Sequence, residues 1–229
     1  MKKSYSWLWF DADGTLFDYE RAESVALEYA FRAVGESFDE QRLRAYRAIN
    51  QELWRALERH EITPADLQSR RFEVVAEGLG LACSPVLLSR AYVEAISERT
   101  ELIDGAEAVL AALAGRCRMA LVTNGLKTVQ RSRVARSAIG DHFATVVISE
   151  EVGAAKPKAE FFDAASAQTG HPAKSEILVV GDNLSADIQG GADYGLDTCW
   201  FNPAGLPRPD GLAITYEIAR LEELLDIVG

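Results

Sequence analysis

Two aspartates close an apolar run near the start of the chain. Residues 7–10 (WLWF) are all apolar, so both faces of an extended segment would be buried, as in a central parallel strand. Asp11 and Asp13 follow directly, and Gly14 lets the chain leave the strand sharply. Carboxylates beside a buried strand are costly unless they are paired, hydrogen-bonded or bound to a cation, so metal binding is our first hypothesis. The alternative is a simple polar turn, because Asp and Gly are common turn residues.

The elements that must position these acids alternate between short apolar runs and helical patterns. Such alternation indicates βαβ units and a parallel sheet. The expected strands lie at 7–10, 119–123, 145–149, 177–180 and 198–201, and the expected helices of this part at 104–113, 129–139, 157–168, 183–194 and 221–228.

Between the first two strands, residues 18–100 carry helically spaced apolar side chains and no convincing strand. Asp39 is a candidate N-cap, and Thr63 and Ser84 each precede a proline at a first helical position. Gly78 and Gly80 mark a helix end. We therefore expect one core from residues 1–17 and 103–229, with a helical insert at 18–102.

Polar side chains follow the expected strands at several points. Because parallel strands end at the same edge of a sheet, residues far apart in sequence can converge there, and a lysine before a helix is the cation that would join them. The residues are Asp11, Asp13 and Thr15 after the first strand, Thr123, Asn124 and Gly125 after the second, Gly181, Asp182 and Asp187 after the fourth, and Lys156.

Composition limits the possible partners. The 24 basic and 35 acidic residues give a net charge of −11, which argues against nucleic acid or an anionic membrane surface as the main partner. Cys83, Cys117 and Cys199 show no C-x-x-C spacing, so free, buried thiols are expected rather than disulfides or zinc. No apolar run reaches the roughly 18 residues of a membrane span, and Asp11 interrupts the apolar start, so we expect a cytoplasmic protein.

The segments DADGT, TNG, KP and GDNLSAD resemble, in order, the four motifs of the haloacid dehalogenase superfamily. The match spans the whole chain. It implies an α/β fold with a Rossmann-like, three-layer core, a parallel sheet and an all-helical cap inserted between the first and second motifs.

The resemblance also implies roles for the residues of the motifs. Asp11 would be the nucleophile that forms an aspartyl-phosphate, and Asp13 the general acid and base, with its backbone carbonyl on the metal. Asp182 would be the third protein ligand besides Asp11 and Asp13, and hard oxygen donors favour Mg²⁺. Phosphate-binding roles fall to Thr123, Asn124 and Lys156. Asp187 would orient Lys156 or metal-bound water rather than bind the metal directly.

The superfamily contains several chemistries, and Asp13 helps to choose among them. A halide leaves without a proton, whereas an alkoxide needs one, so an acid two positions after Asp11 favours phosphate ester cleavage over 2-haloacid dehalogenation. A mutase of the β-phosphoglucomutase type also has both aspartates, and a scaffold without turnover is the non-enzyme alternative.

Among the phosphatases, the chain is most similar to the pyrimidine 5′-nucleotidases. Gly14 and Lys158 depart from that subgroup, which often has acidic residues there. N-acylneuraminate 9-phosphatase and phosphoglycolate phosphatase types are the alternatives. We expect a small phosphate monoester as partner, no nucleic acid or membrane, and either a monomer or a homodimer.

The cap must select the substrate, because the four motifs contact only phosphate and metal. Tyr46, Trp54, Phe72 and Tyr92 have helical spacing that is more typical of a core than of a base-stacking site. Residues 17–19 (FDY), next to the first motif, are better candidates. The histidines at 60, 142 and 171 fit no motif.

Overall fold

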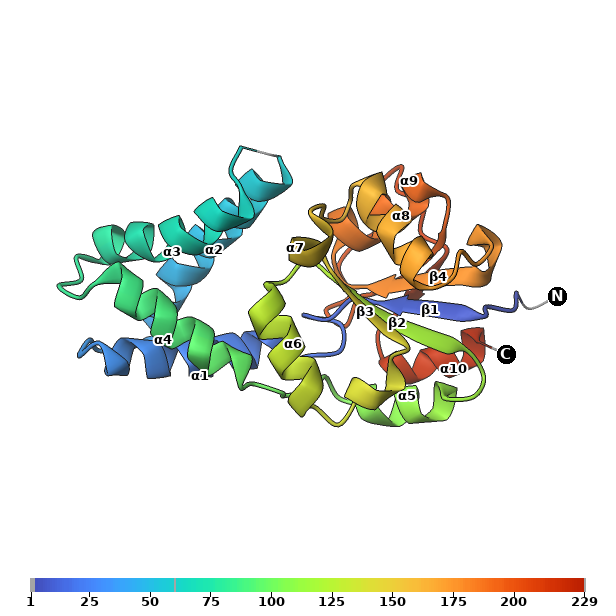
Figure 1. Ribbon diagram of the computed structural model, residues 1–229, viewed down its shortest axis with the longest axis horizontal. Helices are drawn as coiled ribbons and strands as arrows, with labels where there is room; N and C mark the ends of the chain where they lie inside the picture. Colours follow the sequence, from blue (N-terminus) through green and yellow to red (C-terminus); the bar gives the residue numbers. More distant parts are fainter. Residues whose placement is uncertain (1–2, 60, 229) are drawn as a thin grey trace. The chain divides into compact units, whose positions relative to one another are not determined.

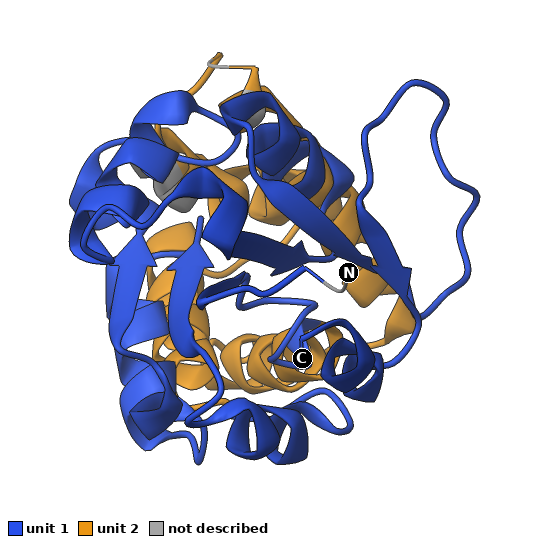
Figure 2. Ribbon diagram, turned by 90° about the vertical axis from the view of Figure 1, so that its right-hand side faces the viewer, with its two compact units in different colours: residues 1–19, 100–229 blue, residues 20–99 orange. Residues whose placement is uncertain are grey.

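The structure is a computed structural model that describes residues 3–59 and 61–228 (Figure 1). The expectation for His60 therefore lies outside the described residues. The chain forms two compact units, one of residues 1–19 with 100–229 and one of residues 20–99 (Figure 2). The α/β fold, its parallel sheet and the inserted helical segment are as predicted.

The larger unit is built on a six-stranded sheet of order β3-β2-β1-β4-β5-β6, in which every pairing is parallel. All four residues of β1 are buried, and Phe10 pairs with Leu121 of β2 and Val180 of β4. The central three strands therefore end at the same edge of the sheet, where β2 runs two residues and β4 one residue beyond the partner of Phe10. The bounds are β1 Trp7–Phe10, β2 Arg118–Thr123, β3 Thr145–Ile148, β4 Ile177–Gly181, β5 Asp197–Phe201 and β6 Tyr216–Ile218.

Alternate residues of β1 face two different helical layers. Leu8 and Phe10 pack in the hydrophobic cluster that includes α5 (Ala106–Leu113) and α10 (Leu224–Ile227). Trp7 and Trp9 pack in the cluster that includes α8 (Ala159–Gln168). These helices cover opposite faces of the sheet (Figure 1), which gives the predicted three layers.

Several helices of this unit differ from the prediction. α6 (Lys127–Arg136) ends before the expected residue 139, and a 3₁₀ turn follows at Gly140–His142. α7 (Ser149–Val152) was not expected, and α8 begins at Ala159, after a cis Lys156–Pro157 bond. The segment expected as one helix from 183 to 194 is a π-helix at Leu184–Gln189 followed by α9 (Gly190–Tyr194). Two 3₁₀ turns, Lys174–Glu176 and Leu221–Glu223, complete the unit.

The helical unit contains α1 (Tyr19–Ala33), α2 (Glu40–Glu58), α3 (Pro64–Leu79) and α4 (Pro85–Ser97). As predicted, the Asp39 side chain caps α2 by accepting from Arg42 N at 2.8 Å. Thr63 forms a capping box at the start of α3, and the left-handed Gly80 ends that helix. Gly78 was predicted near the end but lies inside α3.

Three of the four aromatic residues considered for base stacking form the core of the helical unit. Tyr46, Phe72 and Tyr92 are buried, with ring centroids 5.3–5.8 Å apart. The Arg71 guanidinium lies 5.2 Å from the centroids of the Phe72 and Tyr92 rings. Trp54 is only half-buried. The prediction of a core role is therefore correct for the three buried rings.

Other side chains singled out from the sequence have ordinary positions. Phe17 is fully buried in the larger unit. Cys199 is a buried free thiol as expected, whereas Cys83 and Cys117 are only half-buried. His142 is half-buried and His171 is exposed. Within the described ranges, no helix is both long enough and apolar enough to cross a membrane.

Candidate active site

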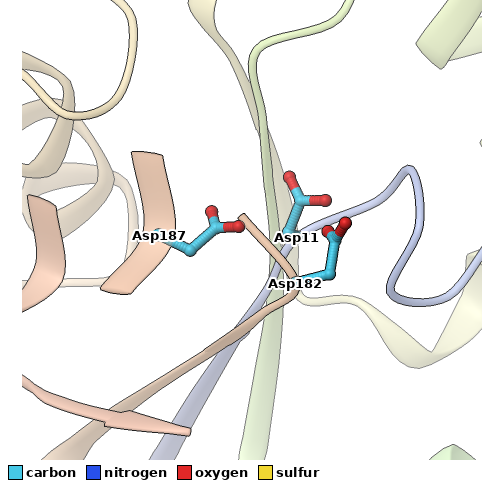
Figure 3. A group of neighbouring side chains, drawn as sticks. All are labelled: Asp11, Asp182 and Asp187. Carbon is cyan, nitrogen blue, oxygen red and sulfur yellow. The ribbon is translucent and has the colours of Figure 1, made fainter. Parts of the chain in front are cut away.

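Three aspartates from different parts of the chain meet at the carboxyl edge of the sheet. Asp11 follows β1, Asp182 follows β4, and Asp187 lies in the π-helical segment. One carboxylate oxygen of each lies within 4.8 Å of the others, and Figure 3 shows the Asp187 carboxylate directed toward Asp11 and Asp182. The predicted convergence at this edge is therefore present for these acids.

Lys156 supplies a positive charge to this cluster from the loop before α8. Its buried Nζ donates to Asp11 Oδ1 and Asp187 Oδ1, both at 2.6 Å, and to the carbonyl of Val122 at 2.8 Å. Asp187 is thus a direct partner of Lys156. The ammonium is held between two carboxylates, where each bond is charge-assisted.

Asn124 positions the backbone of Lys156. Its Nδ2 donates to the Lys156 carbonyl at 2.9 Å, and its Oδ1 accepts from Lys156 N at 2.8 Å. Both the nitrogen and the oxygen of the Asn124 side-chain amide are thus hydrogen-bonded to the Lys156 backbone. The phosphate contact expected for Asn124 stays a prediction. Thr123 is buried, and its hydroxyl accepts from Gly125 N at 3.1 Å.

The electrostatics of the cluster suit a cation. Burial raises the pKa of Asp11 well above its usual range, although Lys156 opposes this. Burial and the neighbouring Asp187 raise the pKa of Asp182 to about 7. Burial lowers the pKa of Lys156, but Asp11 and Asp187 outweigh it and leave the pKa above its usual value. Three carboxylates face one ammonium, so these hard oxygen donors fit a divalent cation such as Mg²⁺.

The Asp182 side chain is oriented by the loop after β1. Thr15 Oγ1 donates to Asp182 Oδ1 and accepts from Asp182 N, both at 3.1 Å. Gly14 has a φ of 85°, and a Cβ there would lie 2.6 Å from Asp182 Oδ2. Glycine therefore leaves room for the carboxylate.

Asp13 lies outside the three-aspartate cluster, because side chains of α6 hold its carboxylate. Gln130 Nε2 donates to Asp13 Oδ2 at 2.6 Å, and Arg133 Nη1 forms an ion pair with Asp13 Oδ1. Sequence reasoning missed both residues. Their spacing of three on one helix, next to the apolar Val129, was the available signal for a buried polar pair.

The fold and this site together define a Rossmann-like α/β hydrolase whose carboxylate and lysine centre lies at the carboxyl edge of a parallel sheet. The model of the haloacid dehalogenase-like hydrolases matches residues 6–195, and the chain belongs to this family. The predicted superfamily is therefore confirmed.

Similar proteins are known over almost the full length. The pyrimidine 5′-nucleotidase YjjG of Escherichia coli is 37% identical, with 96% of each chain covered. The pyrimidine 5′-nucleotidase PynA of Streptococcus pneumoniae is 33% identical, with 97% of this chain and 94% of PynA covered. The magnesium-bound structure of the putative hydrolase YfnB of Bacillus subtilis superposes with a TM-score of 0.93, at 34% identity and 99% coverage of both chains.

Proposed function

We propose that this chain is a Mg²⁺-dependent phosphate monoester hydrolase that acts on pyrimidine nucleoside 5′-monophosphates. The observation that carries the reaction type is the group formed by the buried Asp11, Lys156 and Asp187 and the half-buried Asp182 at one edge of the sheet. The similarity to YjjG and PynA, both pyrimidine 5′-nucleotidases, supports the substrate class.

In the first step, a carboxylate oxygen of Asp11 attacks phosphorus and the bond from phosphorus to the leaving oxygen breaks. The product is an acyl phosphate on Asp11. Lys156 orients the Asp11 carboxylate through the bond to Oδ1 and favours its ionised form. Asp13, in its protonated form, gives its proton to the leaving oxygen and becomes a carboxylate. In the second step, Asp13 takes a proton from water, which attacks the acyl phosphate and releases inorganic phosphate.

The residues that would hold the metal are Asp11, Asp182 and the backbone carbonyl of Asp13. When bound there, Mg²⁺ supplies positive charge that offsets the carboxylates and the substrate phosphate. Burial raises the pKa of both Asp11 and Asp182, and a cation bound between them would favour their ionised forms, which supports this assignment. The similar structure of YfnB is bound to magnesium, which supports the choice of ion.

The remaining roles follow from position. Thr123, Asn124 and Lys156 would bind the transferring phosphoryl group, and the helical unit of residues 20–99 would act as the cap that selects the substrate. The nucleoside leaves as an alkoxide and needs an acid, which Asp13 provides, whereas a halide does not. We further propose a cytoplasmic location, because the three cysteines are free thiols.

A phosphate-release assay tests the proposal. Purified protein is incubated with dUMP, dTMP, UMP, sialic acid 9-phosphate, phosphoglycolate or p-nitrophenyl phosphate, with Mg²⁺ or with EDTA. We expect the highest kcat/KM for a pyrimidine nucleotide, and activity only with Mg²⁺. Asp11→Asn should lower kcat by at least about 10³-fold, because it removes the nucleophile.

The exposed Asp210 offers a matched control, since Asp210→Asn makes the same chemical change on a surface loop. Its activity should equal that of the wild type. Turnover that survives Asp11→Asn would exclude the aspartyl-phosphate. Halide release from 2-haloacids without phosphate release would favour the dehalogenase, and a complete lack of both activities would favour a scaffold.

A further inference from the structure

One helix binds both carboxylate oxygens of Asp13. Gln130 Nε2 donates to Oδ2 at 2.6 Å, and Arg133 Nη1 pairs with Oδ1. Gln130 is 1% exposed and Arg133 is fully buried, whereas the Asp13 side chain keeps 26% of its surface exposed. The buried donors thus hold a carboxylate that itself still reaches the surface of this unit.

Burying Arg133 is costly, because a guanidinium loses its hydration when it leaves water. Two groups that contact its guanidinium come from the loop after β1. Asp13 pairs with its Nη1, and the ring centroid of the buried Phe17 lies 4.3 Å from its Cζ. An apolar residue of similar volume would fill this space at less cost, so the arginine indicates a requirement beyond packing.

The loop between β2 and α6 makes room for Gln130. A Cβ at Gly125 would lie 2.3 Å from Gln130 Nε2 and 2.7 Å from its Cγ. Real contacts are not this short, so the glycine allows the Gln130 side chain to reach Asp13. In addition to the side chains of Thr123 and Asn124, the TNG segment therefore supplies a glycine that leaves space for Gln130.

We propose that Gln130 and Arg133 are positioning residues that fix the Asp13 carboxyl group where, in its protonated form, it can give its proton to the leaving oxygen and become the carboxylate. The inference rests on the proposed hydrolase activity and assigns to two residues of α6 a part in its acid step. Asp13 belongs to a loop, and its side chain would otherwise have rotamer freedom. An acid that is misplaced by about 1 Å can lose on the order of 10²-fold in rate.

Leaving groups of different basicity separate positioning from general damage. In single-turnover experiments with excess enzyme and Mg²⁺, release of deoxyuridine from dUMP needs a proton, whereas release of p-nitrophenolate from p-nitrophenyl phosphate needs little help. We expect Arg133→Met and Gln130→Met to slow deoxyuridine release about 10- to 100-fold and p-nitrophenolate release less than about threefold. KM for dUMP should stay within about twofold, because neither side chain binds the phosphate.

Arg133→Lys keeps a cation that can reach Asp13 and should restore part of the lost dUMP rate. The matched control is Arg131→Met on the same helix, which removes a surface ion pair with Glu151. It should leave both rates unchanged. Equal slowing of both substrates, accompanied by a lower Tm, would assign Gln130 and Arg133 a purely structural role and overturn the inference.

Two further outcomes are distinguishable. If Arg133→Met does not fold, Gln130→Met still decides the question, because it removes one contact to Asp13 and leaves the ion pair with Arg133 in place. If the wild-type protein releases the leaving group from neither substrate, the proposed function itself is wrong. A wild-type enzyme that is active on both, with variants that show no leaving-group dependence, contradicts only the positioning role.

Discussion

Replacing Lys156 with methionine should destabilise the protein strongly when no metal is present. The Nζ donates to Asp11 Oδ1 and Asp187 Oδ1 at 2.6 Å and to the Val122 carbonyl at 2.8 Å. Methionine fills a similar volume but leaves two carboxylates without their cation. The side chains of Asp11 and Asp187 are only 12% and 1% exposed, so water cannot replace the ammonium at Asp187.

The expected loss follows from these contacts. A hydrogen bond to a charged group contributes roughly 1.5–3 kcal/mol, and removing one partner of a buried ion pair costs roughly 3–5 kcal/mol. We therefore expect Lys156→Met to lower the free energy of unfolding by about 3–5 kcal/mol in EDTA. The loss should be smaller with saturating Mg²⁺, because a bound cation offsets part of the exposed negative charge.

Urea unfolding followed by circular dichroism measures this difference. The double variant Lys156→Met/Asp187→Asn should lose about 1–3 kcal/mol less unfolding free energy than the sum of the losses in the two single variants. The reason is that the double variant no longer buries an unpaired carboxylate at Asp187. Lys158→Met removes an exposed lysine two residues further along and should change stability by less than about 0.5 kcal/mol.

Two results would refute this reasoning. One is a loss below about 1 kcal/mol for Lys156→Met in EDTA, which would mean that Lys156 does not bridge buried carboxylates. The other is additivity of Lys156→Met and Asp187→Asn to within about 0.5 kcal/mol, which would mean that the two side chains do not interact.

Two other substitutions test the support of the aspartates. Thr15→Val removes both hydrogen bonds to Asp182 and should raise the Mg²⁺ concentration for half-maximal activity about 10- to 100-fold. Thr15→Ser keeps the hydroxyl and should leave this concentration near the wild-type value. Equal Mg²⁺ concentrations for the two variants would contradict the role of the hydroxyl. Gly181→Ala places a Cβ 2.3 Å from the Asp187 carboxyl and should cost about 1–3 kcal/mol in thermal or urea unfolding. Gly78→Ala meets only ordinary contact inside α3 and should instead stabilise by about 0.5–1 kcal/mol, so similar effects at both glycines would exclude the steric argument.

Local patterns in the chain were enough to predict the fold class and the convergence of Asp11 and Asp182. A continuous apolar run predicted β1 as a buried central strand, because a strand that is covered on both faces has no polar face. The shared edge of parallel strands placed Asp11 and Asp182 together despite their separation in sequence. Helix starts at Asp39 and Thr63 followed from cap chemistry, which depends only on neighbouring residues.

Other elements depended on the assembled sheet. β6 (Tyr216–Ile218) is only three residues long, which is too short for its apolar pattern to distinguish a strand from a loop. It pairs with β5 only in the folded chain. The π-helix before α9 was likewise not visible from sequence. There the Asn183 side chain accepts hydrogen bonds from Ser185 N and Ala186 N, and Asp187 Oδ2 accepts one from Asn183 N at 3.1 Å. Helical periodicity predicts a helix at such a segment but does not define its hydrogen-bond pattern.

The side-chain partners of the acids were decided by tertiary structure alone. Residue types and motif order identified Asp13 and Lys156, but no local pattern pairs Asp13 with Arg133, which lies 120 residues away, or Thr15 with Asp182, 167 residues away. Such pairs form only when strand register and helix rotation bring two side chains within hydrogen-bond distance. The order of residues along a chain encodes periodicity and local capping, whereas the choice of partner for a buried charge arises from three-dimensional packing.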